Sequence, residues 1–422
     1  MNKEKDNGIT EDIKSLLKKN KQEHLLKYLE KANDEQRKEL IKEIKQIDFE
    51  KMNNLYKISK RDIDIPLESA IIEHIKYTDS NKLSKEQIDE LTKIGEDVIR
   101  KNEYAVVTMA GGQGTRLGHK GPKGTFLLNV SPKPKYLFQI IAENLKKSNK
   151  KYNVCLNWYI MTSTENNKKT IDFFEEHNYF NYDKDHVKFF MQGNLPLLSE
   201  DGKLLIDENF KIKIAADGNG CIYKAMKEDK ILDDMKKKNI KWIFIGAVDN
   251  AILNMCDPVL LGLTIKEKNE IGSKSVVKIS PEEKVGVFCK KNNKPYVIEY
   301  SEMPKEMANE VDEDDELLFG ESHIMCNLYS INALEKISNQ ELPYHSAHKK
   351  ASYLKEDLTM FEAKEPNAYK YEAFIFDGFG FFDNISILRG KREIDFAPIK
   401  NKDGNDSPET AIKLYNNKYN SK

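Results

Sequence analysis

Arginine is scarce in this chain of 422 residues, and net charge is almost absent. Lysine and arginine together number 68, but arginine occupies only Arg37, Arg61, Arg100, Arg116, Arg389 and Arg392. The 69 acidic residues cancel the basic ones to a formal net charge of −1. A balanced charge provides no general attraction to nucleic acid or to an anionic membrane, so we expect neither as a partner.

Paired cysteines and long apolar segments are also missing. The five cysteines are scattered without a C-x-x-C pair, which indicates reduced, mostly buried thiols rather than disulfides or a metal site. The longest apolar run, Trp242–Val248, is far too short to span a bilayer. The charged N-terminal stretch "MNKEKDNG" lacks the apolar core of a signal peptide. We therefore expect a cytoplasmic protein, either a monomer or a weak homo-oligomer.

The N-terminal hundred residues are predicted to be helical. The stretch Glu11–Ala32 places several leucines on one broad apolar face. Asn33 followed by Gln36, and Ser84 followed by Gln87, fit the capping box that begins a helix. A break is expected at 62–66. These helices carry no chemical motif, so residues 1–101 are predicted to form a separate helical region.

Strands and helices alternate from Tyr104 onward. The strands expected are "YAVVTM", "VCLNWYIMTS", "VKFFMQG" and "KWIFIGAVDN", with helical stretches between them. This alternation predicts an α/β fold with a mostly parallel sheet and helices on both faces. After Ser273 the strands become antiparallel in character, with a turn at Asn292–Asn293. The predicted catalytic domain covers 102–385, followed by a small C-terminal α+β region at 386–422.

A glycine-rich loop, "MAGGQGTRLGHKGPKGTF", follows the first of these strands and contains six glycines. The dinucleotide fingerprint fails because Leu117 stands where its third glycine is needed, and the P-loop fails because His119 follows Gly118. The loop fits a third pattern, G-G-x-G-T-R-L-G followed by P-K-G. Adjacent glycines let backbone N–H groups face an anion, and Arg116 and Lys123 add cations.

This loop resembles the signature of the UDP-sugar pyrophosphorylases, in the branch that uses N-acetylglucosamine 1-phosphate. The resemblance continues in order through "MQGNLPLL", "AADGNGCIYKAM", "GAVDN", "VGVFCKK", "VIEYSEM", "HSAHKK", "YEAFIFDGF" and "DFAPIKN", about 70% of the chain. It implies a Rossmann-like, GT-A-like nucleotidyltransferase fold with a mixed sheet. It also implies a uridylyltransferase that joins UTP to the sugar 1-phosphate and releases pyrophosphate, with Mg²⁺ as cofactor.

The resemblance also implies roles for individual residues. Arg116 and Lys123 would hold the triphosphate and the charge that develops on it. The other nucleotide positions would be Ala110, Gly111, Gly112, Gln192 as the uracil reader, Gly218, Lys370, and Asp249, which would also hold the metal. The sugar phosphate would contact Asn219, Glu299, Asn327 and Lys400.

The reaction explains why no Ser/His/Asp set is needed. The nucleophile is a phosphate oxygen that is already ionised, so catalysis requires positioning and charge neutralisation rather than a general base. Without the resemblance, Lys370 or Lys400 alone would be interpreted as a solvated surface charge. Asp249 alone could be a helix N-cap.

Three alternatives stay open from the sequence. The segment "GHKGPKG" also resembles the glucose 1-phosphate branch, although that branch usually lacks the arginine at position 116. The resemblance therefore favours the N-acetylhexosamine branch, with glucose 1-phosphate or a broader UDP-sugar specificity as the alternative. Cys221 replaces a glycine that the family often has after "DGNG". A nicotinamide-dependent dehydrogenase and a non-catalytic nucleotide sensor are the remaining two classes.

Overall fold

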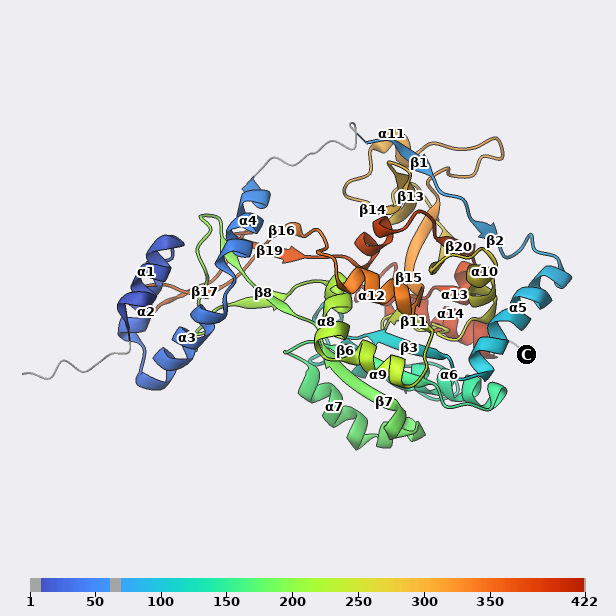
Figure 1. The fold of residues 1–422 in the computed structure, drawn as a ribbon, viewed down its shortest axis with the longest axis horizontal. Coiled ribbons are helices and arrows are strands. Elements are labelled where there is room, and N and C mark those ends of the chain that lie inside the picture. Colours follow the sequence, from blue (N-terminus) through green and yellow to red (C-terminus); the bar gives the residue numbers. More distant parts are fainter. Residues whose placement is uncertain (1–8, 61–69, 421–422) are drawn as a thin grey trace, which may run out of the picture. The chain divides into compact units, whose positions relative to one another are not determined.

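The computed structural model describes residues 9–60 and 70–420, and contacts divide the chain into two compact units (Figure 1). Unit 1 consists of Met1–Pro66, Gly193–Gly218 and Pro343–Phe374. Unit 2 consists of Leu67–Gln192, Asn219–Leu342 and Ile375–Lys422. Each unit therefore joins segments that are far apart in the sequence. The contiguous domains expected from the sequence stay a prediction, and the expected break at 62–66 lies outside the described residues.

Unit 2 is built on a mixed sheet of eleven strands among the described residues, as expected from the sequence. Its main path runs β2-β20-β12-β15-β11-β3-β6-β7. Strands β11, β3, β6 and β7 are mutually parallel, whereas β15 is antiparallel to both β11 and β12. The strands of this path are β2 (Thr78–Asp79), β20 (Ser386–Arg389), β12 (Ile271–Val277), β15 (Glu321–Ser330), β11 (Trp242–Ala247), β3 (Tyr104–Met109), β6 (Asn157–Thr162) and β7 (Val187–Met191).

Three further strands extend this sheet from β15. Strand β13 (Val287–Lys291) pairs with β15, β14 (Lys294–Ile298) and β1 (Ile72–His74). The β13–β14 turn has Asn292 and Asn293 at φ of 51° and 65°, the left-handed conformation that a tight hairpin of this kind requires. This confirms the turn expected there. A separate two-stranded ribbon pairs β4 (Leu127–Leu128) with β5 (Lys135–Tyr136).

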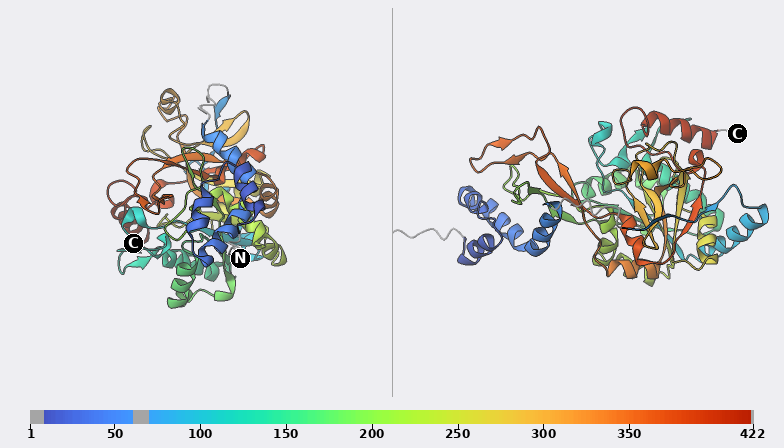
Figure 2. Two further views of the ribbon diagram at one scale, coloured as in Figure 1. Left: turned by 90° about the vertical axis from the view of Figure 1, so that its left-hand side faces the viewer. Right: turned by 90° about the horizontal axis from the view of Figure 1, so that it is seen from above.

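Helices cover both faces of the sheet (Figures 1 and 2). Trp158 of β6 packs in one core cluster with residues of α6, α7, α10 and α14. The next residue, Tyr159, faces the opposite side and donates to Asp234 of α9 over 2.7 Å. The helices of unit 2 are α5 (Lys85–Arg100), α6 (Leu137–Tyr152), α7 (Asn167–Glu176), α8 (Ile222–Glu228), α9 (Ile231–Lys237), α10 (Pro258–Lys266), α11 (Lys305–Ala308), α12 (Ile331–Ser338), α13 (Arg392–Asp395) and α14 (Pro408–Asn420).

Unit 1 packs four helices against short strands: α1 (Glu11–Lys19), α2 (Leu25–Lys31), α3 (Asp34–Gln46), α4 (Phe49–Lys60), β8 (Asn194–Pro196), β9 (Leu198–Ser199), β10 (Ile214–Ala216), β16 (His345–Lys349), β17 (Tyr353–Leu354), β18 (Met360–Phe361) and β19 (Ala368–Glu372). Leu17, Leu29 and Leu40 share a core with Leu204 and Tyr371. The helices thus bury their apolar faces against strands from two distant segments.

The capping boxes at Asn33 and Ser84 are confirmed, but the first helical stretch is interrupted. The chain leaves the helix after Lys19, and Lys21 takes a φ of 57°. Gln22 is buried there, and its amide donates to Gly202 O over 2.8 Å and accepts from Leu204 N over 2.9 Å. A buried amide satisfied by another segment outweighs the propensity of Glu11–Ala32 to continue as one helix.

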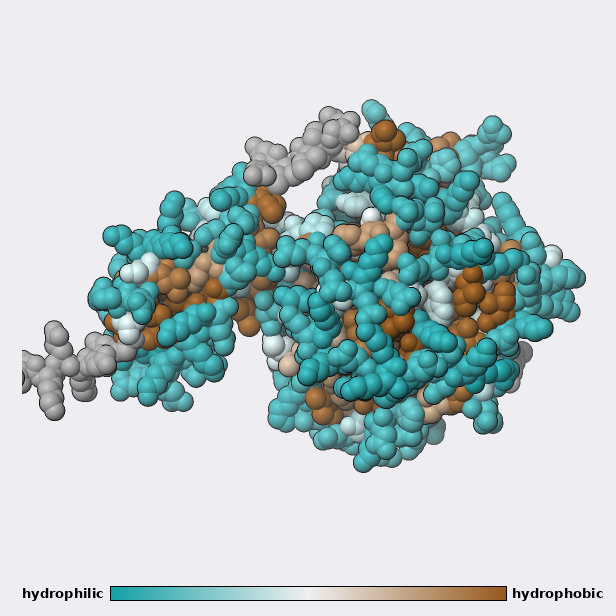
Figure 3. All heavy atoms as spheres, in the orientation of Figure 1, coloured by the Kyte–Doolittle hydropathy of each residue, from teal (hydrophilic) through white to brown (hydrophobic). Residues whose placement is uncertain are grey.

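Hydrophilic residues cover much of the face seen in Figure 3, with scattered hydrophobic ones between them. Within residues 9–60 and 70–420, no helix is both long and apolar enough to cross a bilayer.

Helices α5 and α10 approach until their backbones touch. A Cβ on Gly262 would lie 1.9 Å from Leu91 O, and one on Gly95 would lie 2.1 Å from Pro258 O. Real Cβ atoms do not approach backbone oxygens this closely, so each helix requires glycine at its contact.

We expect Gly262→Ala to destabilise the protein. Alanine improves helix propensity by about 1 kcal/mol, but overpacking costs about 1–3 kcal/mol, and a backbone oxygen cannot rotate away. The urea midpoint should therefore fall. Gly380→Ala is the matched control, since a Cβ there meets nothing within 4 Å. An unchanged or higher midpoint for Gly262→Ala would contradict the close approach of the two helices.

Candidate functional site

The glycine-rich loop and the "VDN" segment meet at the switch point of the sheet. The parallel strands lie in the order β7-β6-β3-β11, so chain connections leave in opposite directions from β3 and β11. Open α/β sheets bind ligands at such a point, beyond the carboxyl ends of the strands. Met109 and Ala247, the last residues of β3 and β11, are paired partners, and Val248 N donates to Met109 O over 3.1 Å. The two loops therefore begin side by side.

The loop folds on itself through its own backbone. Gly114 N donates to Gly121 O over 2.9 Å, and Lys123 N donates to Gly112 O over 3.1 Å. Gly118 has a φ of 71° between these contacts, a conformation that favours glycine. A Cβ at Gly112 would meet nothing within 4 Å, so the backbone there borders open space. This is the geometry that lets an anion reach backbone N–H groups.

His119 ties the second half of the loop together. Its Nε2 lies 2.8 Å from Thr125 Oγ1, and that hydroxyl donates to Pro122 O over 2.8 Å. The imidazole also packs edge-on against Phe126. These contacts hold the 3₁₀ turn η3 (Lys123–Thr125), which carries Lys123.

A buried asparagine holds the first half of the loop. Asn166 is fully buried, and its Nδ2 donates to Ala110 O over 2.9 Å and to Gly112 O over 3.4 Å. Its Oδ1 accepts from Ser163 N over 2.9 Å. Asn166 follows β6, the strand next to β3, so a neighbouring strand end fixes the carbonyl positions of the loop.

The sequence-predicted Lys123 and Asp249 lie in direct contact. Lys123 Nζ donates to Asp249 Oδ2 over 2.9 Å, and both side chains are mostly shielded from solvent. Arg116, in the 3₁₀ turn η2 (Thr115–Leu117), is exposed on the same loop. Lys123 and Asp249 thus meet at the switch point, with the Arg116 cation on the same loop, and this set of charges suits a polyphosphate with a divalent cation.

The backbone of Asp249 is fixed by the C-terminal segment. Its carbonyl accepts from Ile399 N over 2.9 Å. The neighbouring Asn250 is buried, donates to Asp395 O over 2.7 Å and accepts from Ala397 N over 2.9 Å. A segment some 150 residues downstream in the chain therefore sets the position of the predicted metal ligand.

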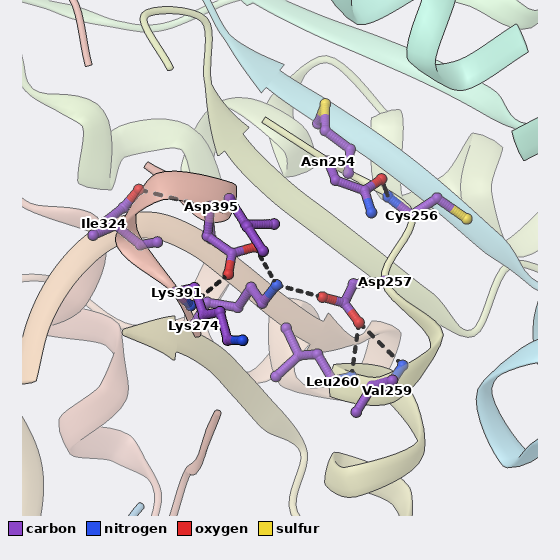
Figure 4. A network of polar contacts seen from close by, with 12 residues as sticks. Asn254, Cys256, Asp257, Val259, Leu260, Lys274, Ile324, Lys391 and Asp395 are labelled. Carbon is purple, nitrogen blue, oxygen red and sulfur yellow. Dashed lines mark hydrogen bonds and ion pairs between the residues drawn. The ribbon is translucent and has the colours of Figure 1, made fainter. Parts of the chain in front are cut away.

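A buried ion network supports this segment in turn (Figure 4). Lys274 Nζ lies 2.6 Å from Asp395 Oδ1 and 2.7 Å from Asp257 Oδ2, and Asp257 caps the N-terminus of α10. Burial would lower the pKa of Lys274, but the two carboxylates outweigh it and raise that pKa above its ordinary value. Burial would likewise raise the pKa of Asp257, yet Lys274 and two backbone N–H groups hold it below its usual range. Lys274 and Asp257 therefore both stay charged.

Gln192, the predicted uracil reader, lies against the glycine pair. It is 8% exposed at the end of β7, and its backbone N donates to Thr162 O over 2.9 Å. A Cβ on Gly111 would stand 2.6 Å from Gln192 Nε2. A side chain at position 111 would displace the Gln192 amide from this place, and the structure brings these two predicted residues together.

The predicted sugar-side residues Glu299 and Asn327 gather on β13–β15. Glu299 Oε1 faces Gly286, whose carbonyl accepts from His323 N over 2.8 Å. Asn327 is fully buried, and its Oδ1 lies 3.0 Å from His323 Nε2 and 2.8 Å from Ser273 Oγ. With the amide oxygen engaged twice, Asn327 Nδ2 is left buried without a hydrogen-bond partner among the described residues. An unused buried donor suits an acceptor on a ligand.

Asn219 joins this group through the turn η7 (Ile375–Phe381). Its Oδ1 accepts from Ile375 N over 2.9 Å, at the first residue of η7. Phe376 and Phe379 of the same turn contact the His323 ring edge-on. The side-chain oxygen of Asn219 is thus already engaged in a hydrogen bond to the protein backbone.

Three predicted residues lie elsewhere. Lys400 follows Ile399, the backbone partner of Asp249, but its Nζ lies 3.6 Å from Asp406. Gly218 and Lys370 belong to unit 1. There, a Cβ on Gly218 would lie 2.2 Å from Ala373 O, and Lys370 Nζ contacts Glu372 over 2.8 Å. The ligand roles of all sequence-predicted residues stay predictions.

Several supporting residues were missed by the sequence interpretation: Asn166, Asn250, Ser273, Lys274 and His323. Asn166 and Asn250 could have been found, because both are polar residues just beyond strands of the parallel core. Ser273, Lys274 and His323 lie within strands, and no local pattern distinguishes them from ordinary strand residues.

Comparisons with known proteins identify the family of the chain. A family model described as UTP–glucose-1-phosphate uridylyltransferase matches residues 27–415. The "Probable UDP-N-acetylglucosamine pyrophosphorylase" of Dictyostelium discoideum is 33% identical over 429 residues, covering 96% of this chain and 88% of that protein. The UDP-N-acetylglucosamine pyrophosphorylase of Saccharomyces cerevisiae is 39% identical over 342 residues, covering 78% and 71%. The solved structure of the inhibitor-bound UDP-N-acetylglucosamine pyrophosphorylase from Trypanosoma brucei superposes with a TM-score of 0.80 at 28% identity, covering 98% of this chain and 85% of that one.

We expect His323 to make stability pH-dependent. Burial lowers the pKa of His323 from 6.5 to about 4, so the unfolded chain binds a proton between these values and the folded chain does not. Stability should be complete above pH 6.5 and fall as the pH drops toward 4, by roughly 3 kcal/mol. The glutamine in His323→Gln offers a side-chain N–H donor but cannot titrate. The urea midpoint of this variant should therefore fall less over this pH range than that of the wild type. Parallel curves for the two proteins would contradict the prediction.

Proposed function

Since the chain belongs to the UTP–glucose-1-phosphate uridylyltransferase family, we propose that it transfers the uridylyl group of UTP to N-acetylglucosamine 1-phosphate. The products are UDP-N-acetylglucosamine and pyrophosphate. The relatives named for this sugar at 33% and 39% identity support the choice of substrate over glucose 1-phosphate.

One observation carries the proposal: Lys123 and Asp249 touch at the switch point beside an open glycine backbone. A dehydrogenase would need the third glycine of the dinucleotide fingerprint, which Leu117 replaces. Leu117 is buried, so this position supports the loop from inside rather than facing a pyrophosphate. A cation and a carboxylate in contact fit a metal–triphosphate, which would separate them by binding between them.

The reaction is a displacement at the α-phosphorus of UTP. A phosphate oxygen of the sugar 1-phosphate forms a bond to this phosphorus while the bond to the bridging α,β-oxygen breaks, and the electron pair leaves with pyrophosphate. The nucleophile needs no base, so the protein's task is to bring two polyanions into line. Backbone N–H groups of Gly111 and Gly112, with Arg116 and Lys123, would neutralise charge on the triphosphate.

The residues at the switch point fit a magnesium ion. Mg²⁺ prefers oxygen ligands, and sites that act on phosphates commonly supply one or two carboxylates while substrate and water complete the octahedron. Asp249 would supply the carboxylate. When bound, the ion would neutralise charge on the phosphates and on the departing pyrophosphate. Lys123, released from Asp249, would then reach a phosphate oxygen.

Side-chain amides would recognise both the uracil of UTP and the sugar of the second substrate. Gln192 can donate and accept at once, as a pyrimidine edge requires. On the sugar side, the unused Nδ2 donor of Asn327 suits the carbonyl oxygen of an acetamido group, with Asn219 and Glu299 toward the hydroxyls. Lys400 would approach a phosphate.

A panel of sugar 1-phosphates tests the substrate. Pyrophosphate release from UTP should require both Mg²⁺ and N-acetylglucosamine 1-phosphate, and kcat/KM for glucose 1-phosphate should be at least about tenfold lower, since an unfilled buried donor costs roughly 1–3 kcal/mol. Equal or faster turnover of glucose 1-phosphate would reject the sugar assignment. The galactosamine form in the same panel defines selectivity at the 4-hydroxyl.

Replacement of Lys123 tests the reaction itself. We expect Lys123→Ala to lower kcat by about 10²–10³, the usual effect of removing one electrostatic contact to a developing charge. Lys120→Ala, an exposed lysine of the same loop, should leave kcat within about twofold, because exposed charges contribute little. Similar kcat values for the two variants would show that Lys123 has no catalytic role.

A further inference from the structure

Cys155 differs from the other four cysteines. Cys221, Cys256, Cys289 and Cys326 are buried, as expected for core thiols, whereas Cys155 is only partly buried. It lies between α6 and β6, beside two residues of the segment that leads into β7. Its Sγ, a carboxylate oxygen of Asp183 and a ring nitrogen of His186 all lie within 4.8 Å of one another. Among the described residues, this is the one cluster of three such side chains with that spacing.

One ring nitrogen of His186 in this cluster makes no hydrogen bond. His186 Nδ1 is buried and makes no hydrogen bond, and it lies 3.3 Å from Asp183 Oδ2. The other oxygen, Asp183 Oδ1, accepts from Asp185 N over 3.0 Å, which fixes the carboxylate. The ring nitrogen and the carboxylate oxygen thus lie at ion-pair distance, but no hydrogen bond satisfies the buried Nδ1 atom. A metal ion bound by this nitrogen would supply the contact that it lacks.

A second layer of contacts orients the thiol. Asn149 Nδ2 lies 3.8 Å from Cys155 Sγ and 3.1 Å from Tyr182 Oη. Asn149 Oδ1 accepts from Leu156 N over 3.1 Å, and Tyr182 donates to Leu156 O over 2.6 Å. Metal ligands are typically held by such outer hydrogen bonds, which also stabilise a thiolate.

The backbone that delivers Asp183 and His186 is unusual. Asn178, Tyr179, Phe180 and Asn181 have φ values of 45°, 50°, 55° and 57°. Four successive left-handed residues without glycine are energetically unfavourable and need support from the surrounding packing. The aromatic packing of Phe180 against Phe173 and Phe174 holds this turn, and the chain then presents Asp183 toward Cys155.

We propose that Cys155, Asp183 and His186 form a binding site for a zinc-class divalent cation. A thiolate, an imidazole and a carboxylate are the donor set of Zn²⁺, whereas Mg²⁺ prefers oxygen alone. Thiolate and carboxylate together balance the charge of the ion, and water would complete a tetrahedron. The thiol proton is released to solvent on binding.

The site lies far from the proposed chemistry. Cys155 and His186 precede β6 and β7, whereas the glycine-rich loop follows β3, and these strands are parallel. The cation therefore sits at the opposite edge of the sheet, where it would link the starts of two neighbouring strands. Its role is to stabilise unit 2, independently of uridylyl transfer.

Cobalt provides the direct test, because a Co²⁺–thiolate bond absorbs light and Zn²⁺ competes for the same ligands. Chelator-treated full-length protein should bind one equivalent of Co²⁺ with the thiolate charge-transfer band. Added Zn²⁺ should abolish the band and raise Tm by a few degrees, and excess Mg²⁺ should do neither. Cys155→Ser should lose the band, and Asp183→Asn and His186→Gln should weaken binding by about 10–100-fold.

His74→Gln, which replaces an exposed histidine of β1, is the control and should bind as the wild type does. Equal Tm of all variants in chelator would show that each is folded, and kcat should change less than about twofold in Cys155→Ser. An absent band, an undiminished band in Cys155→Ser, or equal binding by His186→Gln would overturn the site. If Cys155→Ser does not fold, Asp183→Asn and His186→Gln decide the outcome by the same measurements.

Discussion

The parallel pairing of β3 with β11 is the constraint on which the site depends. Six residues of each strand are in register, and every residue of β3 is buried. A slip by one residue would turn apolar side chains toward the wrong helices and would move Asp249 away from Lys123. The reactive geometry is therefore fixed by the hydrophobic core, and the loops need only continue from strand ends that are already aligned. This explains how a glycine-rich loop can hold one conformation.

Buried amides and one buried ion network extend this control to the loop backbones. Asn166 holds the carbonyls of the glycine-rich loop, Asn250 joins the C-terminal segment to Asp249, and Lys274 anchors that segment through Asp395. Each group would be expensive if it lost its partner, because the interior offers no water as a substitute. Polar interactions here select one arrangement of the loops, whereas apolar burial provides most of the stability.

The parallel core and its loops were predictable because their signals are local. "YAVVTM" and "WIFIGA" are short buried strands, and the strand-end rule places the following loops together. The capping boxes at Asn33 and Ser84 could likewise be predicted from the sequence. By contrast, Gln22 ends a helix through Gly202 and Leu204, whose positions the sequence does not reveal. His323, Lys274 and the Cys155 cluster depend in the same way on partners brought together only by the folded sheet.

The composition of unit 1 has a consequence for how the protein is made. Helices α1–α4 bury their apolar faces against residues 193–218 and 343–374, which leave the ribosome much later. Until then, the emerging helices have no native surface to cover them, and closing such long loops is entropically slow. Unit 1 thus cannot be completed before residues 343–374 have been synthesised, while the parallel core of unit 2 can assemble as soon as β11 has emerged. During that interval the apolar faces of α1–α4 lack their native cover, and transiently exposed surface of this kind favours aggregation.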